Sequence, residues 1–479
     1  MGCAASESGG PPTGGTTGSN GGTGGTSTPT GGTGGTTTPS GGTSGGGSGG
    51  TGGSAIGGTG GSATGGSGGG GTGGAGGGTF QCPTVTTPGD CSPPADIRCP
   101  APKLSLTGCI SATPFSDTKV PLKMASNVIP YEVNSPLWSD GAYKTRGMRL
   151  PTGGKIHVKD CAKNPDECKV LDPNTFKCCA PTADDGKWVF PVGTVMVKNF
   201  AFPDSTRPSG YKVVETRLLV RLDKPAQVAG VSTEWVGYSY QWDDAQTDAK
   251  IVGTLAVGSD VGVSATFQVK PPMAAATQPI TWNYPSRADC ITCHVAITPA
   301  TTPTSGYTLG PETIQMNRTV AGDTMNQIDK LAALNAFETP PSKPYKAALV
   351  VPYDGQAGSV PAGATLEQRA RSYLHANCSF CHRPDGLWPG FDVRYDVPFA
   401  STTTCNAPPG KGDQGVTGAT LLTPKDPSHS VIYLRMVAPA ATATSGGTGR
   451  MPAIASVVVD QQGTKLISDW INSITTCPM

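Results

Sequence analysis

Alternating hydrophobic and polar residues predict β-strands in the middle of the chain. The pattern is clearest, and richest in β-branched and aromatic residues, in four runs: residues 188–200, 211–222, 234–242 and 250–257. Several short strands at this spacing are typical of an antiparallel sandwich or barrel. We therefore predict a β-rich domain over residues 126–285.

Apolar residues recur at helical spacing in the last third of the chain. Residues 365–368 have the sequence of a capping box, and the apolar positions that follow share one helix face as far as Leu374. Residues 466–474 carry a second apolar face with a 3.6-residue period. Two such helices, packed across each other, would close a pocket. We predict mainly α-helical modules over residues 286–345 and 346–479.

The first part of the chain has neither pattern. Residues 9–79 consist mainly of Gly, Thr and Ser, so they bury too little apolar surface to offset the entropy cost of ordering. Residues 1–79 are therefore predicted to be a disordered N-terminus with a flexible linker that acts as a tether. Residues 80–125 hold four cysteines among prolines and predict a loop segment stapled by disulfides.

Composition argues against two kinds of partner. The net charge is +1 and only 14% of residues are charged, so no basic surface for nucleic acid or anionic lipid is indicated. No apolar run reaches the roughly 18 residues that a membrane-spanning helix needs. We expect no nucleic acid partner, and contact with a membrane only through a lipid anchor.

Two copies of Cys-x-x-Cys-His are the clearest chemical signal. The first consists of Cys290, Cys293 and His294, and the second of Cys378, Cys381 and His382. In this motif the two thiols attach a haem covalently through its vinyl groups, and the histidine supplies the proximal ligand to iron. The sequence therefore predicts two covalently bound haem c groups as cofactors.

Zinc binding and thiol redox chemistry are the competing interpretations of these motifs. A zinc ribbon usually brings two Cys-x-x-Cys knuckles within roughly 15–20 residues of each other, whereas 84 residues separate Cys293 from Cys378. A thioredoxin-like motif should follow a strand in a βαβ unit, and neither copy does. Haem attachment is the favoured interpretation.

The distal iron ligands are less well defined. Met451 lies before a proline on a late loop, where a soft thioether donor suits the second haem. Met436 competes with it, but its helical spacing favours a packing role. Met316, which is 22 residues after His294, is the first choice for the first haem. The alternatives are Met325, Met273, His157, a residue from another domain, or an open iron.

Cysteine usage indicates an oxidising compartment. Of fifteen cysteines, four belong to the haem motifs and Cys3 stands apart, which leaves ten for up to five disulfides. Cys405 and Cys477 are the favoured pair, because they are the two cysteines of the last module outside its haem motif. Cys178 and Cys179 are expected to bond to different partners.

Cys3 is a candidate lipidation site. It follows Gly2, as in a bacterial lipoprotein, although Met-Gly-x-x-x-Ser also fits N-myristoylation with palmitoylation at Cys3, and a spare thiol is a third interpretation. Myristoylated proteins are cytosolic, where disulfides are rare and haem c is not made. We therefore expect an exported lipoprotein, in the periplasm or at the outer membrane and cell surface.

Four segments together resemble a bacterial family of exported di-haem c-type cytochromes: residues 134–144, 190–194, 284–294 and 373–382. The resemblance extends over about residues 115–479. It implies covalent haem at both Cys-x-x-Cys-His motifs and electron transfer with redox partner proteins.

The expected function is that of a di-haem electron carrier rather than an enzyme. A di-haem oxidoreductase or peroxidase with one open-coordination haem is the main alternative, and it needs an acid–base group above that iron. A third possibility is a protein whose β-rich domain binds a ligand while the haems are auxiliary.

Overall fold

The computed structural model describes residues 122, 124–164, 169–170, 180–181, 186–228, 231–252, 262–272, 274–296, 305–355, 357–384, 386–439, 449–454 and 456–478. The chain divides into two compact units, Met1–Thr79 and Phe80–Met479, and every described residue belongs to the second. The predicted lipidation site, the tether and the cysteine-rich segment at 80–121 lie outside the described residues. The predicted domain boundaries at 125, 285 and 345 stay predictions.

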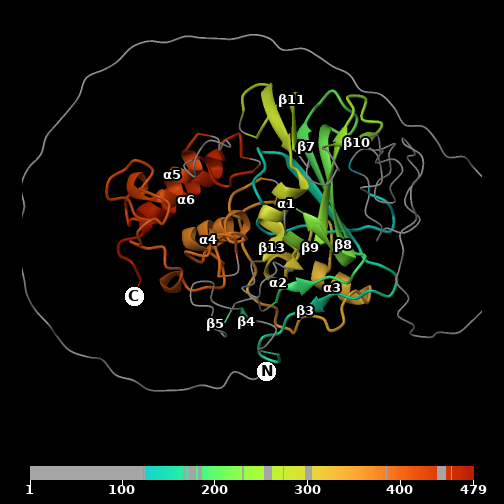
Figure 1. The fold of residues 1–479 in the computed structure, drawn as a ribbon, viewed down its shortest axis with the longest axis horizontal. Coiled ribbons are helices and arrows are strands. Elements are labelled where there is room, and N and C mark those ends of the chain that lie inside the picture. The colour runs from blue at the N-terminus through green and yellow to red at the C-terminus, as the bar shows by residue number, and fades with distance from the viewer. Residues whose placement is uncertain are drawn as a thin grey trace, which may run out of the picture. The chain divides into compact units, whose positions relative to one another are not determined.

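An antiparallel six-stranded sheet forms the first part of the described chain (Figure 1). Its order is β1 (Ile129–Pro130), β2 (Tyr143–Arg149), β7 (Val195–Pro203), β8 (Tyr211–Val228), β9 (Val231–Trp242) and β10 (Ala249–Ile251). Buried Val, Tyr and Trp side chains of the long strands β7, β8 and β9 supply much of the core. The prediction of an antiparallel β region is confirmed.

The predicted run 188–200 contains two strands rather than one. The first is β6 (Trp188–Val189), and the second is β7. Between them Pro191 lacks an amide hydrogen and Gly193 has a φ of 87°, so the chain turns, with the Thr194 amide donating to the Pro191 carbonyl.

Four two-stranded sheets complete the β structure of the described residues. They are β3 (His157–Val158) with β6, β4 (Lys169–Val170) with β5 (Ala180–Pro181), β11 (Val263–Val269) with β12 (Gln278–Tyr284), and β13 (Val295–Ala296) with β14 (Ser305–Gly306). Trp282 and Tyr284 of the β11–β12 hairpin pack against Phe200 and Phe202 of β7 in a buried aromatic cluster. The hairpin therefore packs against the large sheet.

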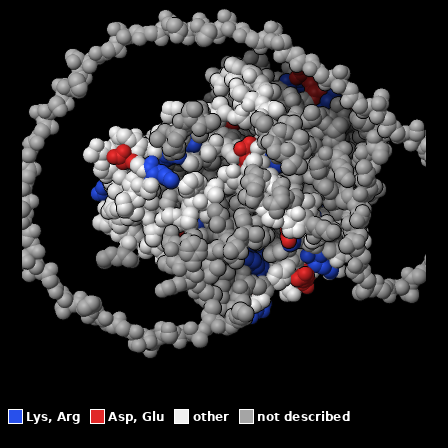
Figure 2. All heavy atoms as spheres, in the orientation of Figure 1, with Lys and Arg blue, Asp and Glu red and all other residues white. Residues whose placement is uncertain are grey.

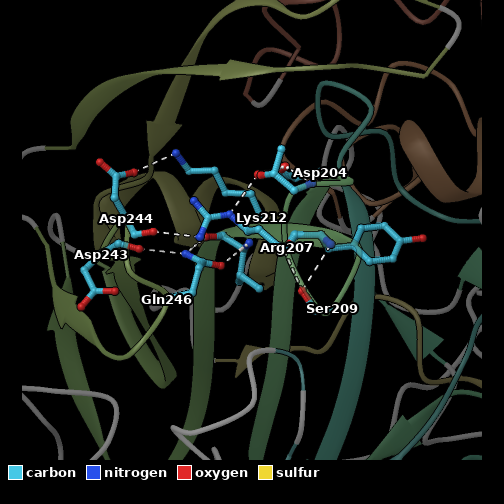
Figure 3. A network of polar contacts seen from close by, with 10 residues as sticks. Asp204, Arg207, Ser209, Lys212, Asp243, Asp244 and Gln246 are labelled. Carbon is cyan, nitrogen blue, oxygen red and sulfur yellow. Dashed lines mark hydrogen bonds and ion pairs between the residues drawn. The ribbon is translucent and has the colours of Figure 1, made fainter.

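A polar network joins the two loops at one end of the sheet (Figure 3). Lys212 forms an ion pair with Asp244 at 2.8 Å, and Arg207 donates to the Asp244 carbonyl at 2.8 Å. Gln246 accepts from the Val213 amide at 2.7 Å and donates to the Val213 carbonyl at 3.0 Å. Asp243 and its neighbours form a turn, as their sequence suggests, and hold the β7–β8 and β9–β10 loops together.

The second part of the described chain is partly helical. Its elements are α1 (Arg287–His294), α2 (Thr313–Met316), α3 (Gln327–Ala333), α4 (Leu366–Asn377), η4 (Phe399–Ser401), η5 (Pro427–His429), α5 (Val431–Val437) and α6 (Gln461–Ser473). The capping box is confirmed, because Thr365 and Gln368 exchange side-chain-to-backbone hydrogen bonds. Helices α4 and α6 pack through a shared apolar cluster, as the two amphipathic faces predicted.

The segment 134–140 links the sheet to the helical part. The Trp138 amide donates to Asn377 at the end of α4, over 2.6 Å. The Trp138 indole donates to the Val458 carbonyl at 3.0 Å, and the Val458 amide donates to Asp140 at 2.7 Å. The two parts are therefore joined by directional hydrogen bonds as well as by apolar packing.

Charged residues are sparse and mixed on the visible surface. On the face drawn in Figure 2, basic and acidic side chains occur in small separate groups, in keeping with a net charge of +1. Among the helices that the structure describes, none combines the length and the apolar character needed to cross a bilayer.

Candidate functional site

The first Cys-x-x-Cys-His motif lies on α1, which packs against β9. Ser286 and Asp289 fix the start of this helix, since the Asp289 carboxylate accepts from the Ser286 amide at 2.9 Å and the Asp289 amide donates to the Ser286 hydroxyl at 3.0 Å. Cys290 contacts the sheet at Gly237. A Cβ on residue 237 would lie only 2.7 Å from the Cys290 sulfur, so glycine leaves the room that this thiol occupies.

His294 is held in one tautomer by a backbone group. Its Nδ1 lies 2.8 Å from the carbonyl oxygen of Tyr307. A carbonyl only accepts, so Nδ1 carries the proton and Nε2 keeps its lone pair. Burial lowers the pKa of His294 to about 4. The ring is therefore neutral and oriented, as a metal-ligating imidazole requires.

The second motif repeats this arrangement at the end of α4. His382 Nδ1 donates to the carbonyl of Trp388 at 3.1 Å, and burial lowers the pKa of His382 to about 4. Phe391 stacks on the imidazole with ring centroids 4.2 Å apart and an angle of 12° between the planes. Both histidines thus present an unprotonated Nε2.

The motif thiols lack the properties of redox thiols. Burial raises the pKa values of Cys290 and Cys378 to about 12. The pKa of Cys293 is raised as well, first by a hydrogen bond with Cys381 and then by burial. Catalytic disulfide-exchange thiols have lowered pKa values, so the raised pKa values of these half-buried thiols argue against thiol–disulfide exchange.

Both motifs line one cavity, which has a volume of about 190 Å³. All six motif residues line it: Cys290, Cys293, His294, Cys378, Cys381 and His382. The Cys381 thiol lies 3.8 Å from the Thr292 carbonyl, and the Tyr307 hydroxyl donates to the Phe380 carbonyl at 2.8 Å. Tyr307 therefore orients His294 with its carbonyl and contacts the second motif with its hydroxyl.

Met451 lines the same cavity, on the loop before α6. Its amide donates to the Arg435 carbonyl at 2.9 Å. The neighbouring Arg450 guanidinium donates to the Ser456 carbonyl at 2.7 Å and the Ala438 carbonyl at 2.8 Å. Met436 is buried in the apolar cluster between α4 and α6. Of Met451 and Met436, the one that lines the cavity together with His382 is thus Met451, the methionine before the proline.

Met316 occupies a different place. Its side chain is fully buried between the sheet and α3, and its sulfur lies 3.7 Å from the Gln327 amide nitrogen. Among the described residues that line the cavity, the methionines are Met196 and Met451. Met196 was not predicted, since a methionine in an alternating strand looks like an ordinary core residue.

The other residues considered for the first haem lie elsewhere or outside the described chain. Met325 is an exposed residue beside α3, and His157 pairs with Glu338 at 3.0 Å. Met273 lies outside the described residues. His375 lines a neighbouring cavity, where its Nε2 donates to Glu312 at 2.8 Å.

Cys405 and Cys477 form the disulfide that the sequence predicted, with Cα atoms 5.7 Å apart. The bond ties the loop that precedes α5 to the segment after α6. Cys161 is also disulfide-bonded, whereas Cys168, Cys178 and Cys179 lie outside the described residues.

The donor set fits haem better than zinc. The site offers two thiol pairs, two neutral imidazoles and a thioether around one mainly apolar cavity. Within the described part of the chain, no three His, Cys, Asp or Glu side chains gather as a zinc knuckle requires. No family model, curated protein or solved structure matches this chain.

Proposed function

We propose that the protein is a di-haem c-type cytochrome that transfers electrons. The observation that carries the proposal is that both Cys-x-x-Cys-His motifs line one cavity, although 83 residues separate them in the sequence. Each motif supplies two thiols for covalent attachment and one neutral imidazole with an available Nε2. Haem, when bound there, would supply reversible one-electron chemistry.

The chain's own residues would set the properties of the two sites. His382 and Met451 would be the axial ligands of the second haem, a pair that raises the reduction potential. The Tyr307 and Trp388 carbonyls would hold the two proximal imidazoles in orientation and increase their basicity. In this proposal mainly α-helical cytochrome modules hold the haems. The β sheet covers the first site and limits the access of water to it.

The contact between the motifs supports electron exchange within one molecule. The Cys293 and Cys381 thiols interact, and Tyr307 bridges the two haem-binding segments. Two redox centres attached to touching motifs would exchange electrons faster than either would with an outside protein. One centre would then accept an electron from a redox partner protein while the other delivers it.

The proposed location is outside the cytoplasm. The Cys405–Cys477 disulfide supports an oxidising compartment. An exported lipoprotein, attached through Cys3 in the periplasm or at the outer membrane and cell surface, is consistent with this bond. Cys3 itself lies outside the described residues.

Mass spectrometry of protein exported together with a cytochrome c maturation system tests this function. We expect two haem additions that survive denaturation and acid–acetone extraction. The Cys378→Ala/Cys381→Ala variant should retain one addition, and Cys290→Ala/Cys293→Ala should retain the other. A wild-type protein without covalent haem, or with bound zinc in its place, would refute the proposal.

Peroxidase-type chemistry at the first haem is the second candidate function. It is favoured by the position of Met316, which packs in the apolar core between the sheet and α3 rather than along the cavity. An iron without a protein distal ligand would be open to small molecules. The wild-type holoprotein should then show a high-spin ferric signal that decreases when peroxide is added. With peroxide present, the protein should also catalyse the oxidation of an added electron donor. A fully low-spin ferric spectrum would exclude this second function.

A further inference from the structure

Three basic side chains lie side by side across the large sheet. The strand register pairs Arg146 of β2 with Lys198 of β7, and Lys198 with Arg217 of β8. Directly paired residues share one face of a sheet, and neighbouring strands are about 4.8 Å apart. Like charges in such positions repel one another. A row of this kind therefore needs a source of negative charge.

The described residues supply only part of that charge. Glu215 pairs with Arg217, with nitrogen–oxygen distances of 2.7 and 2.9 Å. In the described part of the chain Lys198 has no carboxylate partner, and its ammonium group lies over the Phe200 ring at 5.5 Å. Arg146 likewise forms no ion pair with a described carboxylate, since neighbouring Glu132 pairs with Arg318 at 3.3 Å. Three basic groups thus face one carboxylate. Burial and the neighbouring Arg146 lower the pKa of Lys198 well below its usual range, so a further anion is needed to keep all three groups charged.

This row borders the cavity that holds the haem motifs. Lys198 and Arg217 line the cavity itself, and Lys198 and Arg146 line a second, smaller cavity of about 80 Å³ beside it. The smaller cavity is rich in cations: its lining also includes Lys187, Arg383 and Arg394, whereas Glu312 is its one carboxylate among the described residues. Lys198 and Arg217 line the same cavity as Cys290, Cys293 and His294, so the row lies beside the first motif.

We propose that Arg146, Lys198 and Arg217 form the binding site for the carboxylate groups of the haem attached at Cys290 and Cys293. This inference rests on the proposed function. Half-buried basic groups without a partner are costly, and haem carries two propionate carboxylates that could pair with those that Glu215 leaves unpaired. The apolar cavity would take the ring, and the basic side chains at its border would take the propionates.

A measurable consequence is the reduction potential of the first haem. Positive charge near the iron favours the ferrous form, because reduction lowers the charge of the centre. Lys198→Gln removes one charge, so the potential of the first haem should fall. We expect about a tenfold change in the ferrous/ferric ratio at a given potential, which is about 59 mV for one electron. The second haem should shift much less.

Spectroelectrochemical titration of the matured holoprotein, with resonance Raman spectra of the propionate bending bands, tests the site. Lys198→Arg keeps the charge and should keep the wild-type potential. Lys250→Gln, which removes an exposed charge on β10, is the matched control and should change neither readout. Arg146→Gln serves as a second variant if Lys198→Gln does not fold. Lys198→Gln should shift the propionate bands of one haem.

Three results would overturn the inference. The first is an unchanged potential and unchanged propionate bands in both Lys198→Gln and Arg146→Gln. The second is a low-spin to high-spin change of the first haem in Lys198→Gln, which would make Lys198 an axial ligand instead. The third is a wild-type potential that depends on added sulfate, which would assign the basic row to a free anion. Wild-type protein lacking covalent haem would defeat the proposed function itself, so the two failures are distinguishable.

Discussion

Single backbone groups orient the two motif histidines. The carbonyls of Tyr307 and Trp388 accept from Nδ1 of His294 and His382, respectively. Each Nε2 is then unprotonated and able to bind a metal. Because the contribution is a carbonyl, any residue type could make it. The motif histidines were therefore predictable from the sequence, whereas Tyr307 and Trp388 were not. Met451 could be singled out from the sequence, because a methionine before a proline is a local pattern, and its role as a distal ligand stays a prediction.

Met451→Ala is expected to change the second haem only. The variant loses the thioether that we propose as the distal ligand, so a low-spin ferric haem should become high-spin and its reduction potential should fall. Electron paramagnetic resonance of the matured protein measures the change. Met436→Leu is the control, because Met436 lies in the apolar cluster of α4 and α6 and should leave the spectrum unaltered. If Met451→Ala keeps a fully low-spin spectrum, the ligand assignment is wrong.

Asp140 makes stability depend on pH. Burial raises its pKa from 3.8 to about 6, although the Val458 amide, Lys144 and Arg450 favour the charged form. The folded state therefore binds this proton more tightly than the unfolded state. Stability contributed by the group increases as pH falls from 7 to 4, by about 2 kcal/mol for a shift of this size.

Asp140→Asn should remove that dependence, because the amide keeps a carbonyl acceptor for Val458 but does not titrate. Chemical unfolding at pH 4, 5, 6 and 7 compares the two proteins. The variant should be more stable than the wild type at pH 7, with the difference closing near pH 4. Parallel curves for the two proteins would contradict the role of Asp140.

At the scale of elements, periodicity predicted the helices and strands whose positions depend mainly on local sequence. The capping box set the start of α4, and strands β8 and β9 appear where alternation is strong. The run at 188–200 split because Pro191 and Gly193 turn the chain, although the residues around them favour strands. The close packing of α1 against β9 was not predictable from the sequence, since it depends on the absence of a side chain at Gly237.

Gly237→Ala tests the packing of α1 against β9. The added methyl group would lie 2.7 Å from the Cys290 sulfur, so the Cys290 side chain or helix α1 must shift away from β9. Overpacking of this kind costs roughly 1–3 kcal/mol. We expect haem occupancy at Cys290 and Cys293 to fall while occupancy at Cys378 and Cys381 stays complete, as measured by peptide mass spectrometry. Gly390→Ala, where a Cβ meets nothing within 4 Å, should leave both occupancies complete. Equal occupancies in Gly237→Ala would refute the contact.

At the scale of the whole molecule, the segment 134–140 and Tyr307 bring distant parts together. Trp138 contacts both Asn377 and Val458, which lie on either side of the second haem motif in the sequence. From the sequence, the two motifs are expected in separate modules, because contacts across such separations leave no periodic pattern. The shared cavity is thus a product of tertiary packing, and it is the feature from which fast electron exchange is inferred.

The shared cavity predicts electronic coupling between the two haems. Chromophores attached to motifs whose Cys293 and Cys381 thiols interact should couple, so the matured wild-type protein should give a two-signed circular dichroism signal in the Soret region. Cys290→Ala/Cys293→Ala and Cys378→Ala/Cys381→Ala each leave one haem and should give a one-signed band. The sum of the two variant spectra is the control, since uncoupled haems would reproduce the wild-type spectrum by addition. Such additivity, with two haems present, would mean that the centres lie apart and that the motifs do not act as one unit.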